Sequence, residues 1–372
     1  MSDGASSRPA GPVLSAWSVV SPLGSSSTDF AEGLRTDRPA VAELDPARWP
    51  GPYRRACLVP GFDAVTALGR KGTRSMDRAS ALAVTAVGNL LNDGGARLSG
   101  VDDSLGLALG TSIGSVQSTV DFTRDSLVNA RPYLVDPARF PNTVMNCAAG
   151  QAAIWHRLKG PNATVAGGRA TGLLVLRYAS RLLRAGHATA LLGGAVEEFS
   201  TARAWLRWHA GGRTDPDAVL GEGVALWLLE HPDRARANGR DGLATVVDLE
   251  FGYASTDHEV EPVLVAGLRR LWERTGAGPA DIGLVADSGA SGVDGAGERA
   301  ALDGVFDGRQ PERLTVAHRI GDTYAASAAF QVAAVLARAT TGPCVATGPR
   351  LALVTSVEGR GVVGAALLRV GR

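Results

Sequence analysis

The sequence predicts an α/β fold in which buried strands alternate with amphipathic helices. Short apolar runs such as residues 105–110 and 190–196 contain or end in glycines, and such short buried runs are typical of strands. Longer segments such as residues 79–91 carry apolar residues at helical spacing. The alternation restarts near residue 236, which indicates two halves of similar construction.

The first half begins with a strand within residues 12–21, which Pro22 and Gly24 break. A serine-rich turn can then cap a helix from about Asp29. The further elements that we expect in this half are a helix over 79–91 ending at Asn92-Asp93-Gly94-Gly95, a strand over 105–114, a helix over 116–130, a helix through Gln151 and Leu158, a short strand before Gly167 and Gly168 with a helix after them, and strands within 188–198 and 221–230.

The second half repeats the pattern. We expect a strand over 244–255, a helix over 261–275 with a glycine stop, a strand that ends in small residues over 282–292, a small-residue helix within 322–342 and a closing hairpin over 351–370. We therefore divide the chain into a disordered lead-in over 1–12, one half over 13–234 and a second half over 235–372.

Composition and charge exclude several classes of partner. Hydrophobic residues make up 45% and charged residues 20% of the 372 residues, as in ordinary globular proteins. A net charge of +1 gives no basis for binding nucleic acid or a membrane surface. No apolar run reaches the roughly 18 residues of a membrane span, and no signal peptide is apparent. The three cysteines stand far apart without a CxxC pair, which favours a cytoplasmic protein without disulfides or zinc.

The stretch TVAGGRATGLLVLRYAS, residues 164–180, has the form of a turn that presents a reactive side chain at the start of a helix. The residue on that turn is Arg169, which cannot act as a nucleophile. A cation there opposes the helix dipole by a few tenths to about 1 kcal/mol, so Arg169 needs an anionic partner.

Five phrases in order resemble the β-ketoacyl synthases of the thiolase-like superfamily. They are VVSPLGSSSTDFAEGL, FPNTVMNCAAGQAAI, LKGPNATVAGGRATGLLVLRYASRLLRAG, LLGGAVEEFS and GEGVALWLLE. Together they span about residues 14 to 230, and weaker matches continue to the C-terminus. The resemblance implies a thiolase-like five-layer α-β-α-β-α sandwich made of two fused, similar halves, and a dimer.

The resemblance also implies a chemistry whose residues are missing here. Active members carry a cysteine at the turn, where the helix start supplies backbone N–H groups to the developing oxyanion, and two histidines that assist decarboxylation of malonyl carrier protein. Arg169 stands at the cysteine position, Ser288 at the first histidine and Asp322 at the second. A nearby lysine position reads Ala317, and Gly359 replaces the phenylalanine of the C-terminal glycine loop. The chain is similar to a degenerate ketosynthase without catalytic residues.

One branch of the family is built this way, namely the chain length factors (ketosynthase β) of type II polyketide systems. ADSGASGVDGAGERAAL and GDTYAASAAFQVAAVL resemble that branch. This implies a subunit that is not an enzyme alone, pairs with an active ketosynthase, shapes the elongation tunnel and needs no cofactor or metal. Acyl carrier protein would deliver the chain on its phosphopantetheine arm. Familiar members have glutamine at the position of Arg169, and FPNTVMNCAAGQAAI is closer to fatty-acid synthases. The departures suggest, as a hypothesis, a highly reducing, polyene-forming system.

Two alternatives stay open. The chain could be a stand-alone enzyme for acyl transfer, cyclisation or decarboxylation, with Arg169 holding an anion, or a homodimeric scaffold without chemistry. For Arg169 itself, the simpler interpretation is a residue that fills the vacated pocket and pairs with a local carboxylate. Because Asp322 holds a family position near the turn, the specific prediction is an Arg169–Asp322 ion pair.

Six residues are candidates for the tunnel or the partner interface. Val116, Thr119, Val120 and Thr123 fall on neighbouring turns of one helix and can share a face, in the region where chain length factors close the tunnel floor. Their modest size would leave room for a longer chain, although an ordinary amphipathic helix explains them equally well. Met145 and Cys147 belong to the segment near the dimer seam, and Cys147 is interpreted as a packing residue rather than a substitute nucleophile.

Overall fold

A computed structural model describes residues 11–93, 104–210, 218–341 and 351–371. The strands are β1 (Val13–Val20), β2 (Ala42–Glu43), β3 (Arg55–Cys57), β4 (Gly106–Gly110), β5 (Asn162–Val165), β6 (Ala190–Glu197), β7 (Leu220–Gly221), β8 (Gly223–Glu230), β9 (Ala244–Ala254), β10 (Ile282–Asp287), β11 (Glu312–Thr315), β12 (Leu351–Ser356) and β13 (Gly361–Val370). The α-helices are α1 (Ser27–Arg35), α2 (Ala64–Leu68), α3 (Arg78–Asp93), α4 (Val116–Val128), α5 (Cys147–His156), α6 (Thr171–Arg184), α7 (Thr201–Ala210), α8 (Pro232–Ala237), α9 (Val260–Thr275), α10 (Gly292–Phe306), α11 (Ala317–Ile320) and α12 (Ser327–Thr341).

The strand order shows that the chain is built from two similar halves. The main sheet runs β11-β10-β12-β13-β9-β1-β8-β6-β4-β5. Outward from β1, the pairs with β8 and then β6 are antiparallel, and the pairs of β6 with β4 and of β4 with β5 are parallel. Outward from β9, the strands β13, β12, β10 and β11 follow the same sequence of directions. The short antiparallel contact of β1 with β9 joins the two copies.

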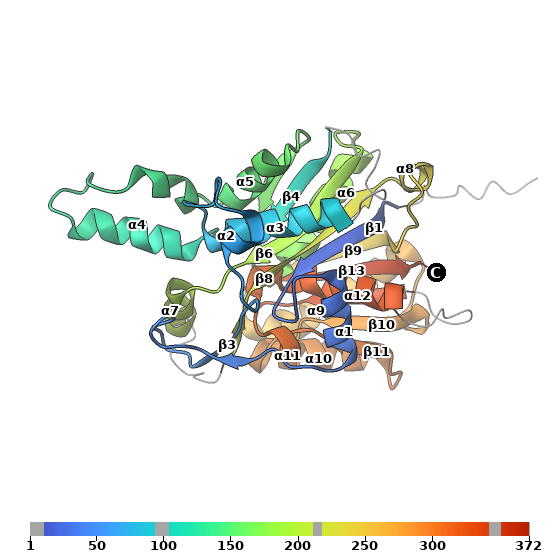
Figure 1. Cartoon of the computed structure of the whole chain (residues 1–372). Helices are drawn as coiled ribbons and strands as arrows, with labels where there is room; N and C mark the ends of the chain where they lie inside the picture. The colour runs from blue at the N-terminus through green and yellow to red at the C-terminus, as the bar shows by residue number, and fades with distance from the viewer. Residues whose placement is uncertain (1–10, 94–103, 211–217, 342–350, 372) are drawn as a thin grey trace, which may run out of the picture.

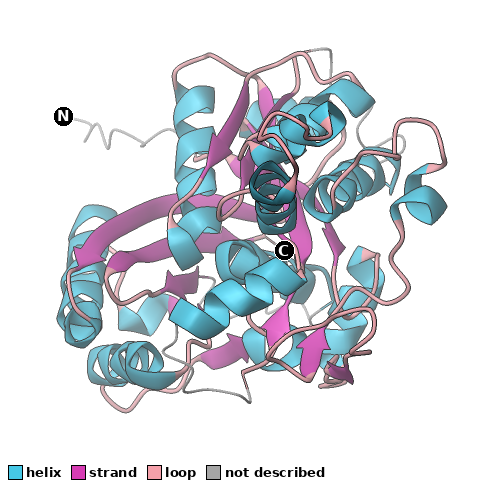
Figure 2. Ribbon diagram, turned by 90° about the vertical axis from the view of Figure 1, so that its left-hand side faces the viewer, coloured by secondary structure: helices cyan, strands magenta, loops and turns pink. Residues whose placement is uncertain are grey.

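Alternate residues along the strands face different cores, and this creates five layers. In β8, Ala225, Trp227 and Leu229 pack with α6 and α12, whereas Val224, Leu226 and Leu228 pack with α3 and α5. In β13, Ala366 and Leu368 face the α6–α12 core, while Ala365 and Leu367 face α9 and α10. The layers are therefore α3 and α5, the β1–β8 side of the sheet, α6 and α12, the β9–β13 side, and α9 and α10 (Figures 1 and 2).

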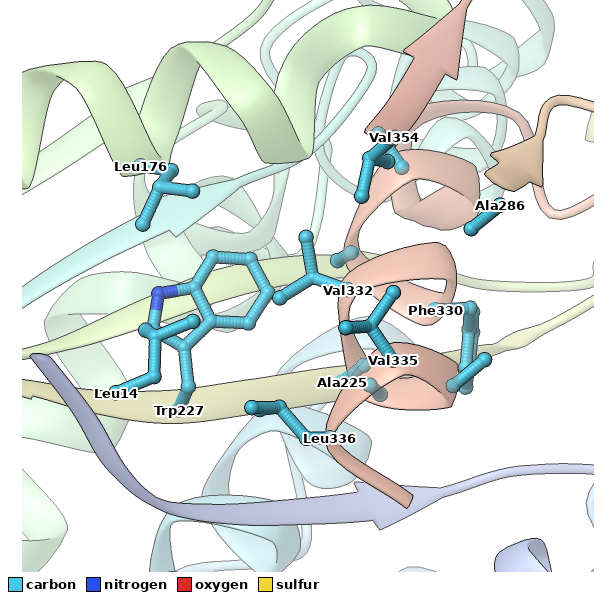
Figure 3. Close-up of a cluster of buried hydrophobic side chains, with 14 of the residues drawn as sticks. Leu14, Leu176, Ala225, Trp227, Ala286, Phe330, Val332, Val335, Leu336 and Val354 are labelled. Carbon is cyan, nitrogen blue, oxygen red and sulfur yellow. The ribbon is translucent and has the colours of Figure 1, made fainter. Parts of the chain in front are cut away.

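The central layer is thoroughly buried. Residues 327–337 of α12 are all buried, as the small-residue composition of this helix allows in a layer covered on both sides. Trp227 fills the space between the helices and the sheet, with Leu14, Leu176 and Val332 around it (Figure 3). Both α6 and α12 belong to this rigid core, so the first turn of each helix is held in a fixed position.

Most predicted elements are present, with a few differences. Ser26 caps α1 by accepting from the backbone N–H of Asp29. The predicted helix through Leu158 instead ends at His156, because Arg157 adopts a left-handed conformation at φ 58° and closes the helix. The sequence analysis did not predict the helices α2, α7, α8, α10 and α11 or the strands β2, β3 and β11. The expected helix stop at Gly94 and the lead-in up to residue 10 lie outside the described residues.

Candidate functional site

The turn before α6 buries Arg169. It connects β5 to α6 through a short 3₁₀ turn, η3 (Gly168–Ala170), and the Arg169 residue is only 9% exposed. Gly168 adopts φ 60°, and a Cβ built on it would lie 1.7 Å from Oε2 of Glu358. Glycine is thus required at this position both by its backbone conformation and by the close approach of a carboxylate.

The structure confirms the predicted ion pair between Arg169 and Asp322. Nη1 of Arg169 donates to Oδ1 of Asp322 at 2.8 Å, and Nη2 donates to Oδ2 at 2.6 Å. The two side chains are 11% and 22% exposed. Burial by itself would raise the pKa of Asp322, but Arg169 outweighs it and holds the pKa well below its ordinary value. Both charges are satisfied by two parallel bonds, the strongest geometry for such a pair.

The backbone on both sides of Asp322 is held as well. Arg203, on α7, donates from Nη2 to the carbonyl oxygen of Asp322 at 2.9 Å. The backbone N–H of Tyr324 donates to Oδ1 of Asp322 at 2.9 Å. Tyr324 has φ 41°, an unfavourable conformation for a bulky residue that persists only where the surroundings impose it.

A second carboxylate, Glu358, completes the cluster from the connection between β12 and β13. Its Oε2 accepts from the backbone N–H of Arg169 at 3.1 Å, and its Oε1 accepts from the hydroxyl of Tyr324 at 2.9 Å. The guanidinium of Arg169 lies over the Tyr324 ring, 5.7 Å from its centroid. Burial, followed by Glu358, raises the pKa of Tyr324. We call Arg169, Asp322, Tyr324 and Glu358 the Arg169 cluster.

Ser288 belongs to a separate buried network. Its hydroxyl and backbone N–H both donate to the carboxyl group of Glu298 on α10. The hydroxyl of Thr355 also donates to Glu298, at 2.6 Å. Burial is the main cause that raises the pKa of Glu298 to about 7. Arg169, Ser288 and Asp322 therefore do not form one group, since Arg169 and Asp322 are paired and Ser288 is engaged elsewhere.

Cys147 lies at the start of α5 among polar side chains. Its Sγ lies 3.4 Å from Oδ1 of Asn142, 3.1 Å from Nε2 of Gln151 and 3.9 Å from Oγ of Ser80. Burial, and then the nearby Asp77, raise the pKa of its thiol. A raised pKa opposes the thiolate form that a nucleophile needs. The interpretation of Cys147 as a packing residue stays a prediction.

The four candidate tunnel residues lie on α4. Val116 is buried at the start of the helix, while Thr119, Val120 and Thr123 are exposed. The N-terminus of α4 is fixed by Glu198, which accepts from the hydroxyl of Ser115 and the backbone N–H of Gln117. Burial, together with Asp77, raises the pKa of Glu198 to about 8.

Large apolar side chains gather around α4 and the segment that follows it. We call α4, the loop after it and the 3₁₀ helix η2 (Pro137–Thr143) the α4 arm; it projects from the body of the molecule (Figure 1). Most of the exposed large hydrophobic residues in the described part of the chain lie on or beside this arm: Ile113, Val120, Leu127, Val128, Tyr133, Leu134, Phe140, Val144, Met145 and Ile154. Exposed apolar side chains gathered in this way are typical of an interaction surface.

Several residues of the site were missed by sequence reasoning. Tyr324 lies two residues after Asp322, and Glu358 directly precedes Gly359. Their positions beside residues that the resemblance had singled out were the available signal. Among the described residues, no set of histidine, cysteine and carboxylate side chains is grouped to hold a metal ion. In the same part of the chain, the helices are too short or too polar to cross a membrane.

Comparison with known proteins shows similarity to β-ketoacyl synthases. The family described as Beta-ketoacyl synthase, N-terminal domain, matches residues 13–235. The 3-oxoacyl-[acyl-carrier-protein] synthase 2 of Vibrio cholerae is 26% identical over 254 residues, which cover 63% of this chain and only 61% of that protein. The synthase of the same name from Rhizobium meliloti is 26% identical over 366 residues, 87% of this chain and 86% of that protein.

Solved structures extend the likeness over nearly the whole chain. A chain of the ishigamide ketosynthase/chain length factor is 40% identical, with a TM-score of 0.88 over 97% of this chain and 99% of that chain. A β-ketoacyl synthase from Burkholderia phymatum is 21% identical with a TM-score of 0.84, over 98% of this chain and 100% of that chain. AntDE:AntF, a type II PKS acyl-carrier protein in complex with its ketosynthase, gives 17% identity and a TM-score of 0.82, over 98% and 100%. The last two show a common fold.

Proposed function

This chain belongs to the β-ketoacyl synthase family, and from that premise we propose that it is a chain length factor. In this role it pairs with an active ketosynthase, contributes to the elongation tunnel and limits the length of a polyketide. It does not catalyse condensation itself. The thiol and the catalytic histidines come from the partner, and an acyl carrier protein supplies the acyl groups.

The observation that carries this proposal is the Arg169–Asp322 pair. Condensation needs a nucleophile at the turn and a base nearby, and these two positions instead hold a cation and an anion that bond to each other at 2.8 and 2.6 Å. Neither residue can become a thiolate or an imidazole. The 40% identity with a chain of the ishigamide ketosynthase/chain length factor supports the same assignment.

The α4 arm supports a partner subunit. On this arm the residues Leu127, Tyr133 and Phe140 are 79%, 65% and 57% exposed in the single chain. Aromatic and large aliphatic residues of this kind form the centre of subunit interfaces. A heterodimer that covers the arm would bury this surface and bring α4 close to the shared tunnel.

The stand-alone enzyme gains no support from the site. Its anion holder would be Arg169, whose two terminal nitrogens both donate to Asp322. A substrate carboxylate would have to displace this pair. We therefore retain the chain length factor as the function that the geometry favours.

Within this role we also propose a highly reducing, polyene-forming system. The support is the arginine in place of glutamine at the turn and the absence of bulky side chains at Thr119, Val120 and Thr123. Supplying ketoreductase and dehydratase activities to the assembled complex should give conjugated, ultraviolet-absorbing products. Efficient release of unreduced aromatic products would contradict this finer assignment.

The test of the main proposal is co-expression with the ketosynthase encoded beside it. We expect a one-to-one complex by size-exclusion mass measurement, and chain elongation from carrier-protein substrates only when both chains are present. A chain that stays apart from the ketosynthase but turns over acyl thioesters alone would overturn the proposal.

A further inference from the structure

The backbone N–H of Arg169 is a hydrogen-bond donor at the position where active relatives are expected to carry the cysteine. It lies in the turn that opens α6, where unpaired N–H groups carry partial positive charge. In a site for acyl transfer such a donor bonds the oxygen of the reacting carbonyl. In this chain the donor is already used, because Oε2 of Glu358 accepts from it at 3.1 Å.

Glu358 is held at this position from several sides. Its other oxygen accepts from Tyr324, and Tyr324 keeps its left-handed backbone through the bond from its N–H to Asp322. The loop that carries Glu358 is also tied to α10, since the N–H of Gly359 donates to Oδ2 of Asp294 at 2.9 Å. Gly168 leaves the space that the carboxylate fills.

We infer that the carboxylate of Glu358 occupies the position that the oxygen of a reacting acyl group would take beside the N–H of Arg169. By this contact Glu358 holds the β12–β13 loop closed against the turn before α6, and we call this contact the latch. The inference deepens the proposed function, on which it rests, by explaining how the pocket excludes thioesters. An arginine in place of cysteine removes the nucleophile. In addition, Glu358 fills the space beside the N–H of Arg169 that the carbonyl oxygen of an acyl group would need. Restoring a cysteine at position 169 alone should therefore leave the pocket closed.

Amide hydrogen exchange tests the latch with Arg169 still in place. We expect exchange of the amides within residues 167–171 and 356–361 to become about tenfold faster in Glu358→Ala, because the variant loses a hydrogen bond to a charged group. Glu358→Gln keeps an acceptor for this N–H and should change the rate less than Glu358→Ala does. The control Glu261→Ala removes an exposed carboxylate of α9 and should leave both segments unchanged. Equal rates in the native chain and Glu358→Ala would overturn the inference.

Thiol labelling gives a second, independent measurement. In Arg169→Cys/Asp322→Asn, which removes both charges of the ion pair, we expect slow alkylation of the new cysteine by iodoacetamide and by iodoacetate. Adding Glu358→Ala should accelerate both reactions by about tenfold, with the larger gain for anionic iodoacetate, because the carboxylate position becomes empty. Equal reactivity with and without Glu358 would contradict the latch.

These measurements test the role of Glu358 independently of the proposed function as a chain length factor. Hydrogen exchange and alkylation can be followed in the complex with the ketosynthase and in the chain alone, and neither needs elongation. Faster exchange in Glu358→Ala together with failure to form a ketosynthase complex would sustain the latch and reject the proposed function. Unchanged exchange in a complex that elongates would reject the latch alone.

Discussion

Arg169 and Asp322 are 153 residues apart in the sequence and form a bidentate ion pair at 2.8 and 2.6 Å. They come from the two halves of the chain, at the start of α6 and in the segment before α12. The pair therefore ties the two halves of the chain together. The stability of the fold should therefore depend on this pair.

Removing one member of the pair should destabilise the protein strongly. Arg169→Gln or Asp322→Asn should each lower the free energy of unfolding by about 3–5 kcal/mol, because each leaves a largely buried charge without its partner. Arg169→Met/Asp322→Leu should recover most of that loss. Urea unfolding followed by circular dichroism measures the difference.

The matched control is the exposed pair of Arg35 and Glu32, whose side chains are 67% and 56% exposed. Arg35→Gln should change the free energy of unfolding by about 0.5 kcal/mol or less. A double variant at 169 and 322 as unstable as the singles would show that the pair does not act as a unit.

Glu198 should make the protein less stable as the pH rises. Burial and Asp77 raise its pKa to about 8 from an ordinary value of 4.5, so the folded state retains a proton that the unfolded state has released. The contribution of Glu198 to the free energy of unfolding should therefore fall between about pH 4.5 and pH 8, by about 1.4 kcal/mol per pH unit at most. Glu198→Gln stays neutral, and should flatten this part of the stability profile.

Glu250 provides the control of opposite sign. Its pKa lies below the ordinary value because its ion pairs with Arg270 and Arg274 outweigh burial. The contribution of Glu250 to the free energy of unfolding is present above the pKa of the unfolded state and is lost as the pH falls below it. Glu250→Gln should therefore leave the slope of the free energy of unfolding against pH unchanged between pH 4.5 and pH 8. An equal slope in the native protein and Glu198→Gln would contradict the assignment.

The α4 arm should govern assembly with the partner. Tyr133→Asp or Phe140→Asp should weaken binding to the ketosynthase by tenfold or more, about 1.4 kcal/mol, because each places a charge on an apolar interface. Val41→Asp, at an exposed apolar residue distant from the arm in sequence, should bind normally. Calorimetric titration compares them, and normal affinity of both arm variants would remove the arm from the interface.

The fold could be predicted from the sequence because its signals are local. Apolar runs that contain glycine or end in it predicted β4 and β6, and the serine-rich turn predicted α1. The helix α10 was missed because its sequence GVDGAGERAALDGVF combines glycines with a buried Glu298, and its burial depends on tertiary contacts. The helix α7 escaped because its apolar side is short and Trp205 and Leu206 stay exposed.

The site was predictable only where family positions guided it. Arg169 and Asp322 were expected to meet, and they do. Tyr324 and Glu358 were not identified, because their roles depend on a left-handed backbone and on a loop that returns from the far end of the chain. Such contacts carry no periodic signal. The roles of Val116, Thr119, Val120, Thr123, Met145 and Cys147 at a tunnel or partner surface stay predictions.

The measurement that tests the central claim most directly is product length from the assembled complex. Val116→Phe and Thr119→Phe place a large ring on the α4 face proposed to line the tunnel, whereas Asp125→Phe, on the opposite face, serves as control. Mass spectrometry of carrier-bound products should show shorter chains for the first two variants and native chains for the control, at equal complex formation. Native product lengths in all three variants would contradict the claim that this chain sets the length of the polyketide.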